Sequence, residues 1–176
     1  KNILALRNDR FGEFLLIIPA LQSLKKIYPG AKISLGVEQS VKPIAELVEC
    51  VDGVLIWDEV KKDLRRYRFD LAVIFNPTKE AHVATFFAGV PIRLGYGRKW
   101  GFLLTHKIGD TKHLGNRHEV ICNLELIESL KNKEQSLACR RGRPSEKSLD
   151  FCLNVPGSEK YDYLSGAVAI HPFTSD

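Results

Sequence analysis

The sequence predicts an α/β fold in which a parallel sheet carries helices on both of its faces. Short apolar runs without helical periodicity alternate along the chain with longer segments of helical character, the order expected of βαβ units. The first apolar run, Asn2 to Arg7, lacks the polar alternation of a half-exposed strand and therefore fits a strand buried on both faces. Hydrophobic residues make up 44% and charged residues 27% of the 176, which is typical of a globular protein.

The first helix is expected to follow this strand directly. Residues Asn8 to Glu13 form a turn into a helix from Phe14 to Tyr28, whose apolar side chains cover most of its surface and predict deep burial. Pro19 lies inside this segment and should kink the helix, because proline lacks the backbone N–H that an interior helical position donates. Pro29 and Gly30 end it.

The same alternation continues through the next sixty residues. We expect right-handed crossovers between parallel strands, which place helices on both faces of the sheet. The expected elements are a strand at Lys32–Val37, a helix at Lys42–Cys50, a strand at Gly53–Trp57, a basic helix at Val60–Tyr67, a strand at Asp70–Phe75, a helix at Lys79–Ala88 and a strand at Ile92–Leu94.

The rest of the chain is less regular. The glycine-rich segment 95–115 predicts a long surface connection with a short strand at 102–105, and Asn116 with Glu119 resembles a capping box that opens a helix to Leu130. The polar segment 131–147 predicts an excursion from the sheet. The last expected elements are a strand at 149–155, a helix at 158–164 and a buried strand at 167–171.

Charge and composition exclude several classes of protein. The net charge of +5 favours anionic ligands in general. No apolar run reaches the roughly 18 to 20 residues of a membrane span, and no signal sequence precedes the first strand, so we expect an intracellular location. The basic residues are not interleaved with stacking aromatics, which argues against a nucleic-acid partner. The widely spaced cysteines predict reduced structural thiols: Cys50, Cys122, Cys139 and Cys152.

The segment Arg7-Asn-Asp-Arg-Phe-Gly-Glu13 is the main candidate for chemistry. It follows the first strand, and ligands of open α/β sheets bind beyond the carboxyl ends of the strands. Gly12 permits close approach of a ligand to the backbone, and free N–H groups at the helix start attract anions. Glu13 is either a partner of the helix dipole or a general base. The segment lacks the signatures of a P-loop and of a dinucleotide site.

These residues resemble glycosyltransferase family 9, which contains the ADP-heptose:lipopolysaccharide heptosyltransferases. The opening motif Arg7-x-Asp-Arg-x-Gly-Glu13 is followed by Ile18-Pro-Ala-Leu21 and Tyr28-Pro-Gly-Ala-Lys-Ile33. Weaker matches follow in the family's order, at Tyr67-x-Phe-Asp-Leu71, Arg93-x-Gly-Tyr96 and His118-x-Val120. The resemblance covers nearly the whole chain.

The resemblance implies a Rossmann-like domain that forms the N-terminal half of a two-domain GT-B glycosyltransferase. Residues 1–165 would bind the acceptor, and residues 166–176 would form the first strand and phosphate-binding turn of the nucleotide-sugar-binding domain. The implied activity is inverting transfer of a heptose, or a related sugar, from an ADP-sugar donor to the lipopolysaccharide core. The alternative is a non-catalytic or degenerate relative that binds an anionic sugar or another phosphorylated ligand.

The resemblance also assigns roles on the acceptor side. Glu13 stands where the family usually has Asp and would be the base, while Asp9 either replaces it or pairs with Arg7 or Arg10. Arg10 and Gly12 would lie beside the acceptor. His118 either hydrogen-bonds near a helix cap or faces the acceptor. Arg98, with Arg93 and Lys99, either binds acceptor anions or belongs to a solvated basic loop.

On the donor side, His171, Thr174 and Ser175 would hold the diphosphate through hydroxyl and backbone donors. No cofactor or metal is expected, because the family's inverting reaction proceeds without one. The basic run Lys61, Lys62, Arg65, Arg66 and Arg68 is either a solvated face or a contact with an acidic membrane. We therefore expect a cytoplasmic protein that contacts the inner face of the bacterial inner membrane peripherally.

Overall fold

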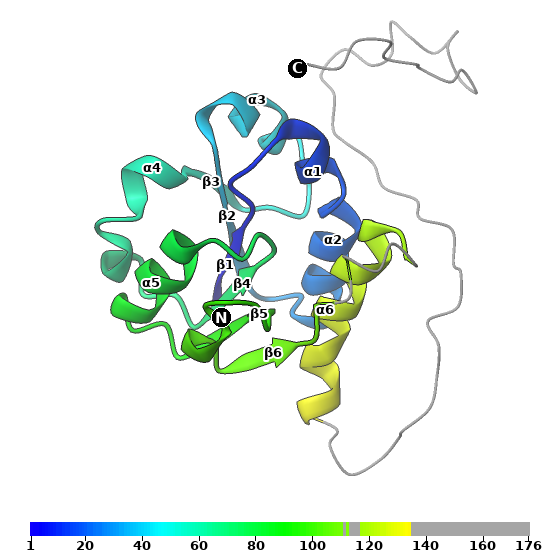
Figure 1. Cartoon of the computed structure of the whole chain (residues 1–176). Coiled ribbons are helices and arrows are strands. Elements are labelled where there is room, and N and C mark those ends of the chain that lie inside the picture. The colour runs from blue at the N-terminus through cyan, green and yellow to red at the C-terminus, as the bar shows by residue number, and fades with distance from the viewer. Residues whose placement is uncertain (111, 113–116, 135–176) are drawn as a thin grey trace, which may run out of the picture.

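The protein is an α/β domain built on a six-stranded parallel sheet (Figure 1), and its coordinates are a computed structural model. The structure describes residues 1–110, 112 and 117–134. The strand order is β3-β2-β1-β4-β5-β6, and each pair of neighbouring strands is parallel. The direction of chain progression reverses between β1 and β4, and such a switch point is where open α/β sheets bind ligands.

The strands lie close to where the sequence predicts them. Their bounds are β1 Asn2–Leu6, β2 Lys32–Val37, β3 Gly53–Ile56, β4 Leu71–Ile74, β5 Ile92–Tyr96 and β6 His106–Ile108. The helices and 3-10 turns are α1 Phe11–Leu15, α2 Ile18–Ile27, η1 Gln39–Val41, α3 Lys42–Ala45, α4 Trp57–Val60, η2 Leu64–Tyr67, α5 Lys79–Phe87, η3 Gly101–Leu103 and α6 Glu119–Glu134.

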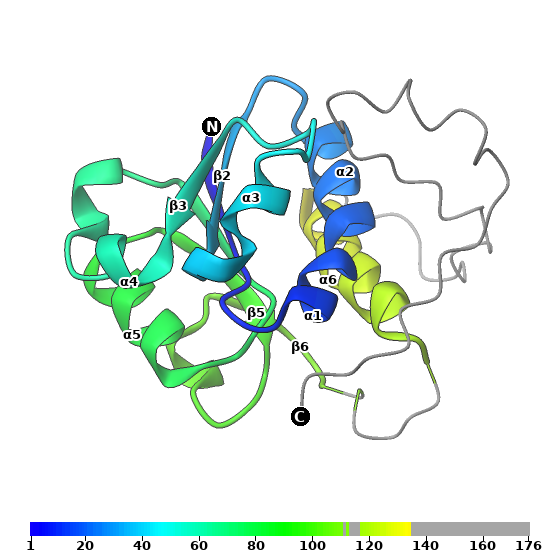
Figure 2. The same cartoon turned by 90° about the horizontal axis from the view of Figure 1, so that it is seen from above.

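Helices cover both faces of the sheet, as the sequence predicts. Alternate residues of the strands point to opposite faces, so Ile3 packs with α2, α3 and α6 in one core while Leu4 packs with α4 and α5 in the other. Figure 2 shows the sheet between these two layers. Residues 3 to 6 of β1 are completely buried, which accounts for the unbroken apolar run in the sequence.

The first helix differs from its prediction, because the expected kink at Pro19 is a complete break. The chain forms α1 and α2 as separate helices, and Pro19 lies in the first turn of α2. Proline in the first turn is favourable because the N–H it lacks has no helical partner there. The break leaves α1 as a short separate helix at the carboxyl end of β1.

Three other predicted elements are wrong in extent or type. The basic helix at Val60–Tyr67 is instead the end of α4 followed by the 3-10 turn η2, and the helix predicted at Lys42–Cys50 ends at Ala45. The short strand predicted at 102–105 lies at His106–Ile108. In each case the local pattern identified an ordered segment but not its hydrogen bonding, which depends on the neighbouring elements.

The remaining predictions lie outside the described residues. These are the capping residue Asn116, the elements expected at 149–155, 158–164 and 167–171, the domain expected to start at residue 166, and Cys139 and Cys152. Within the described part of the chain, none of the helices combines the length and apolar character needed to cross a bilayer.

Candidate functional site

Arg7 is the centre of a charged cluster at the carboxyl end of β1. Its side chain is only 4% exposed, and its backbone N–H donates to the carbonyl of Gly36 in β2, which extends the sheet by one residue. The guanidinium donates from Nε to Asp9 (2.7 Å), from Nη2 to Glu13 (2.6 Å) and from Nη1 to Glu119 (3.0 Å). One buried cation therefore binds two carboxylates of its own turn and a third, that of Glu119, which is 112 residues away in the sequence.

Lys112 completes the cluster from the segment after β6. Its ammonium donates to the same Glu119 oxygen that accepts from Arg7, at 2.7 Å. Glu119 is the first residue of α6, whose N-terminus therefore lies at the same edge of the sheet as Arg7. Because all six strands are parallel, the segments that follow β1 and β6 start at the same edge of the sheet, and α6 begins at that edge.

The cluster carries a net negative charge, since three carboxylates face two cations. The side chain of Glu13 is 38% exposed, so it is the carboxylate of the three most open to solvent. Partial burial and the nearby carboxylate of Glu119 raise the pKa of Glu13 above its ordinary value, and the opposing effect of Arg7 is smaller. Lys112 and Arg7 lower the pKa of Glu119. Environment thus separates the two glutamates into a more basic and a more acidic carboxylate.

A buried amide side chain in α6 supports the cluster through hydrogen bonds. Asn123, which is fully buried in α6, accepts from the hydroxyl of Tyr96 (3.1 Å) and from Lys112 (3.3 Å). Its amide nitrogen donates to the carbonyl of Leu16 (3.2 Å), in the break between α1 and α2. Asn123 therefore connects the break that positions α1 to the lysine that binds Glu119.

Arg10 and Gly12 lie on the exposed side of the same turn. Arg10 precedes α1 with an extended backbone and is exposed. A Cβ added to Gly12 would meet no atom within 4 Å, so packing among the described residues does not require glycine at this position. The open space beside Gly12 is consistent with the expected approach of a ligand. Asp9 pairs with Arg7, which is one of the two roles that the sequence analysis left open for it.

Arg98 follows β5 and also lies at the carboxyl edge. Its Nε contacts Asp110 at 2.5 Å, and the same aspartate accepts from the backbone N–H of Lys112. The guanidinium is half exposed, so Arg98 can still reach an anion. Arg93 differs, because its guanidinium donates to the backbone carbonyls of Val90 and Leu103 and so has a structural role.

His118 is the residue before α6, and it is exposed. Its carbonyl accepts from the backbone N–H groups of Ile121 and Cys122, and its Nδ1 lies 3.3 Å from the N–H of Val120. This is the capping interpretation of His118, with Nδ1 as the acceptor. The helix begins at Glu119, whose carboxylate contacts Arg7 and Lys112, and Asn116, the other residue of the predicted capping box, lies outside the described residues.

The donor-side candidates His171, Thr174 and Ser175 lie outside the described residues. In the part of the chain that is described, no group of three or more His, Cys, Asp or Glu side chains has an arrangement that could hold a metal ion. Arg7 is placed among the three clustered carboxylates, which is the arrangement of an ion-pair network.

Sequence reasoning missed the partners that complete the cluster. Glu119 was considered only for capping, and Lys112, Asn123 and Tyr96 received no role. Tyr96 and Glu119 lie within or beside motifs of the resemblance, which could have drawn attention to them. No sequence signal marks Lys112 or Asn123, because their partners come from distant elements.

A six-stranded parallel sheet in this order, with helices on both faces, defines a Rossmann-like α/β domain, and its charged cluster lies beside the switch point. Comparison with known proteins narrows this class. In sequence the chain is 25% identical over 144 residues to a putative glycosyltransferase of Haemophilus influenzae, covering 76% of this chain and 41% of that protein. No protein-family model matches the sequence.

Three of the solved structures that share this fold are glycosyltransferases. E. coli ADP-heptose lipopolysaccharide heptosyltransferase II aligns with a TM-score of 0.68 at 19% identity, covering 94% of this chain and 50% of that one. A family 9 glycosyltransferase of Veillonella parvula gives 0.65 at 18% identity, with coverages of 74% and 41%. E. coli heptosyltransferase WaaC, solved with ADP, gives 0.61 at 17%, with coverages of 74% and 48%.

These comparisons confirm the resemblance to glycosyltransferase family 9: the chain has the fold of heptosyltransferases and a glycosyltransferase as a sequence relative. The chain spans half or less of the length of each of these proteins.

Proposed function

We propose that this chain is the acceptor-binding part of an inverting glycosyltransferase that transfers a heptose, or a related sugar, from an ADP-sugar to the lipopolysaccharide core. The observation that carries the proposal is the Glu13 carboxylate, which is partly exposed at the carboxyl end of β1, beside the switch point. The similarity to glycosyltransferases supplies the reaction class.

Glu13 would act as the general base. It removes the proton from the acceptor hydroxyl while that oxygen attacks the anomeric carbon of the donor sugar. The bond from this carbon to the diphosphate breaks as the glycosidic bond forms on the opposite face, and ADP leaves with the electron pair. A pKa raised by burial and by Glu119 makes the carboxylate a better proton acceptor. Arg7 would hold the carboxylate in place through its bond of 2.6 Å.

Other residues would bind the two substrates. Asp9, Arg10, Gly12, Arg98 and His118 would lie along the acceptor, and the exposed cation of Arg98 suits an acidic or phosphorylated sugar. Residues 1–165 would form the acceptor domain and residues 166–176 the start of the donor domain. The donor diphosphate would contact His171, Thr174 and Ser175, without a cofactor or metal. This role places the protein in the cytoplasm, at the inner face of the inner membrane.

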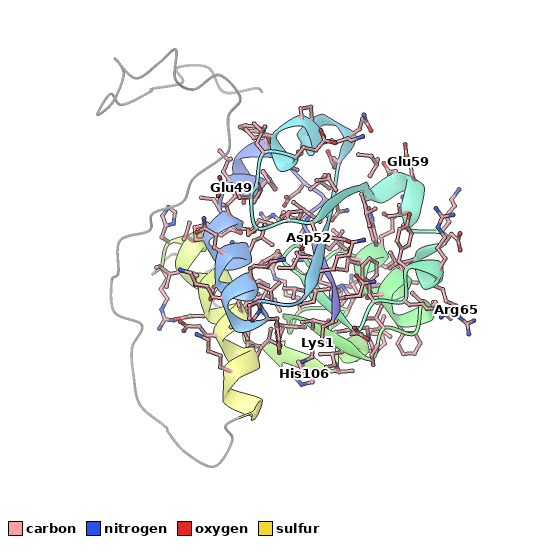
Figure 3. All side chains as sticks on the ribbon, turned by 180° about the vertical axis from the view of Figure 1, so that it is seen from behind. Lys1, Glu49, Asp52, Glu59, Arg65 and His106 are labelled. Atoms are coloured by element: carbon pink, nitrogen blue, oxygen red, sulfur yellow. The ribbon has the colours of Figure 1, made fainter. Side chains whose placement is uncertain are left out.

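The test is Glu13→Gln in the full-length protein, which removes the base but keeps the shape of the side chain. We expect turnover to fall roughly 100- to 10,000-fold, the usual contribution of a positioned base, with little change in the dissociation constant of ADP. Glu13→Asp, which restores the family's residue, should keep most of the activity. Glu59→Gln is the matched control, because Glu59 is exposed on α4 (Figure 3), an element that contributes no residue to the cluster. Turnover of Glu13→Gln at the wild-type rate would refute the role of Glu13.

A second candidate function is a non-catalytic module that binds an anionic sugar. The ion pair between Glu13 and Arg7 favours it, because the guanidinium occupies one of the two carboxylate oxygens that could accept the proton of the acceptor. A glutamate in place of the family's aspartate points the same way. This candidate predicts saturable binding of the acceptor by the full-length protein with neither sugar transfer nor donor hydrolysis.

A further inference from the structure

Aromatic side chains gather on the surface around α5, on the face of the sheet opposite to α2 and α6. Phe87 is 76% exposed, Phe102 is 70% exposed and Phe86 is 44% exposed. Almost all other large apolar side chains of the described residues are buried or half-buried, with Phe11 as the further exception. Exposed apolar side chains that cluster, unlike scattered ones, mark a surface that contacts another apolar phase.

The exposed rings come from two elements that pack together. Phe86 and Phe87 form an edge-to-face pair at the end of α5, with ring centroids 5.5 Å apart. Trp100 and Phe102 form a second pair in and beside η3, at 5.9 Å. Helix α5 (Figure 1) contacts η3, and Arg93 lies over Phe86 while it donates to the carbonyl of Leu103 in η3, so the two pairs belong to one surface. We call it the α5–η3 patch and define it as Lys79, Phe86, Phe87, Lys99, Trp100 and Phe102.

The patch and its surroundings are basic. The ammonium of Lys79 lies 5.2 Å from the centroid of Trp100, and the guanidinium of Arg93 lies 5.3 Å from that of Phe86. Arg93 bonds to backbone carbonyls, which do not neutralise its charge. From residue 81 to residue 109 the sequence has no Asp or Glu, while it has two arginines and two lysines, of which Arg98 pairs with Asp110. The patch therefore combines exposed rings with an excess of positive charge.

The basic run at 61–68 lacks this combination. Lys61 bonds to Asp58 and Glu80, and Arg66 bonds to Asp63, so part of its charge is already neutralised within the protein. Arg65 extends into solvent (Figure 3), but the run has no exposed large apolar side chain. Of the two basic surfaces, only the α5–η3 patch can insert rings as well as attract anions.

We propose that the α5–η3 patch binds the surface of a bilayer rich in acidic phospholipids. Aromatic rings are favoured at the membrane–water interface, and neighbouring cations are attracted to acidic headgroups. Two copies of this chain would not associate through the patch, because its cations would then face each other. The inference does not depend on the role of Glu13.

The test is sedimentation of the full-length protein with vesicles of phosphatidylethanolamine and phosphatidylglycerol, with phosphatidylcholine vesicles as the uncharged comparison. We expect binding to the acidic vesicles that weakens with salt. Phe87→Ser and Phe102→Ser should each weaken it by roughly tenfold, as expected when one phenylalanine no longer leaves water. Both side chains are largely exposed, so neither variant should affect folding.

A matched pair of charge reversals distinguishes the two basic surfaces. Lys99→Glu, in the patch, should weaken binding, whereas Lys62→Glu, in the basic run, should have the smaller effect; both lysines are exposed. A dependence on Lys62 alone, or equal binding by both serine variants and the wild type, would overturn the proposal. So would a wild-type dimer that Phe87→Ser dissociates, because the patch would then be an interface between copies.

A last measurement asks whether another part of the protein covers the patch. A cysteine introduced as Phe87→Cys should react rapidly with a maleimide in solution and slowly once acidic vesicles are added. Slow labelling without vesicles would show that the patch is already buried, which contradicts a membrane-binding surface. The described native thiols are half-buried at Cys50 and buried at Cys122, so mass spectrometry of the labelled peptide separates them from the new site.

Discussion

Replacing Arg7 with methionine should destabilise the protein by about 3 kcal/mol. Three charge-assisted hydrogen bonds converge on this buried guanidinium, and each contributes roughly 1.5 to 3 kcal/mol at full burial. The three carboxylates are 25% to 38% exposed, so water can solvate them in part when the guanidinium is lost. Because of this partial solvation, we expect a loss of stability at the lower end of the roughly 3 to 5 kcal/mol that breaking a buried ion pair costs. Methionine retains most of the apolar stem and leaves little cavity.

The assay is urea unfolding of the full-length protein at several pH values. Arg7 stabilises ionised carboxylates, so the deficit of Arg7→Met should be largest at neutral pH and should narrow as the pH falls and the carboxylates become protonated. Arg66→Met is the control, because the ion pair of Arg66 with Asp63 is about two-thirds exposed, and it should unfold like the wild type. A deficit below about 1 kcal/mol, or one that is equal at pH 4 and pH 8, would refute this account of the cluster.

Three further predictions test the support of the site and the packing of the sheet. Glu119→Gln should shift the acidic limb of the kcat/KM profile to lower pH, since losing this neighbouring charge lowers the pKa of Glu13; an unmoved limb contradicts the coupling. Asn123→Ala should cost about 1 to 3 kcal/mol in urea unfolding, because the half-buried carbonyl of Leu16 and the buried hydroxyl of Tyr96 lose their partner. Gly36→Ala should cost about 1 kcal/mol, since its new Cβ would lie 2.8 Å from a leucine methyl, whereas Gly53→Ala, with no atom within 4 Å, should not meet this clash.

The sequence by itself determined the sheet and the place of the candidate site. Apolar runs that are buried on both faces can only be central strands of a covered sheet, so β1, β2 and β4 agree with their predictions within a residue or two. The motif from Arg7 to Glu13 follows the first strand, and a parallel sheet places that segment at its ligand-binding edge. These inferences rest on local pattern and chain order, which the sequence contains in full.

Short elements were less predictable, because their patterns do not identify their hydrogen-bond partners. The segment from Val60 to Tyr67 has helical composition, yet it forms only the end of α4 and the turn η2. Pro19 was expected to bend one helix, and it starts a second one, where Asn123 supplies a donor to the freed carbonyl of Leu16. That donor is more than a hundred residues away, so the local sequence does not reveal it.

Tertiary structure alone decided which carboxylates of the site bind the same guanidinium and in which direction their pKa values shift. Glu13 and Glu119 are 106 positions apart, and nothing in the spacing of the two predicts that one guanidinium binds both. Their opposite pKa shifts arise from burial and from the distances to Arg7 and Lys112, which exist only after α6 has packed beside the carboxyl end of β1. Electrostatic energy depends on separation in space and on the surrounding dielectric, and the order of residues along a chain specifies neither until the chain has folded.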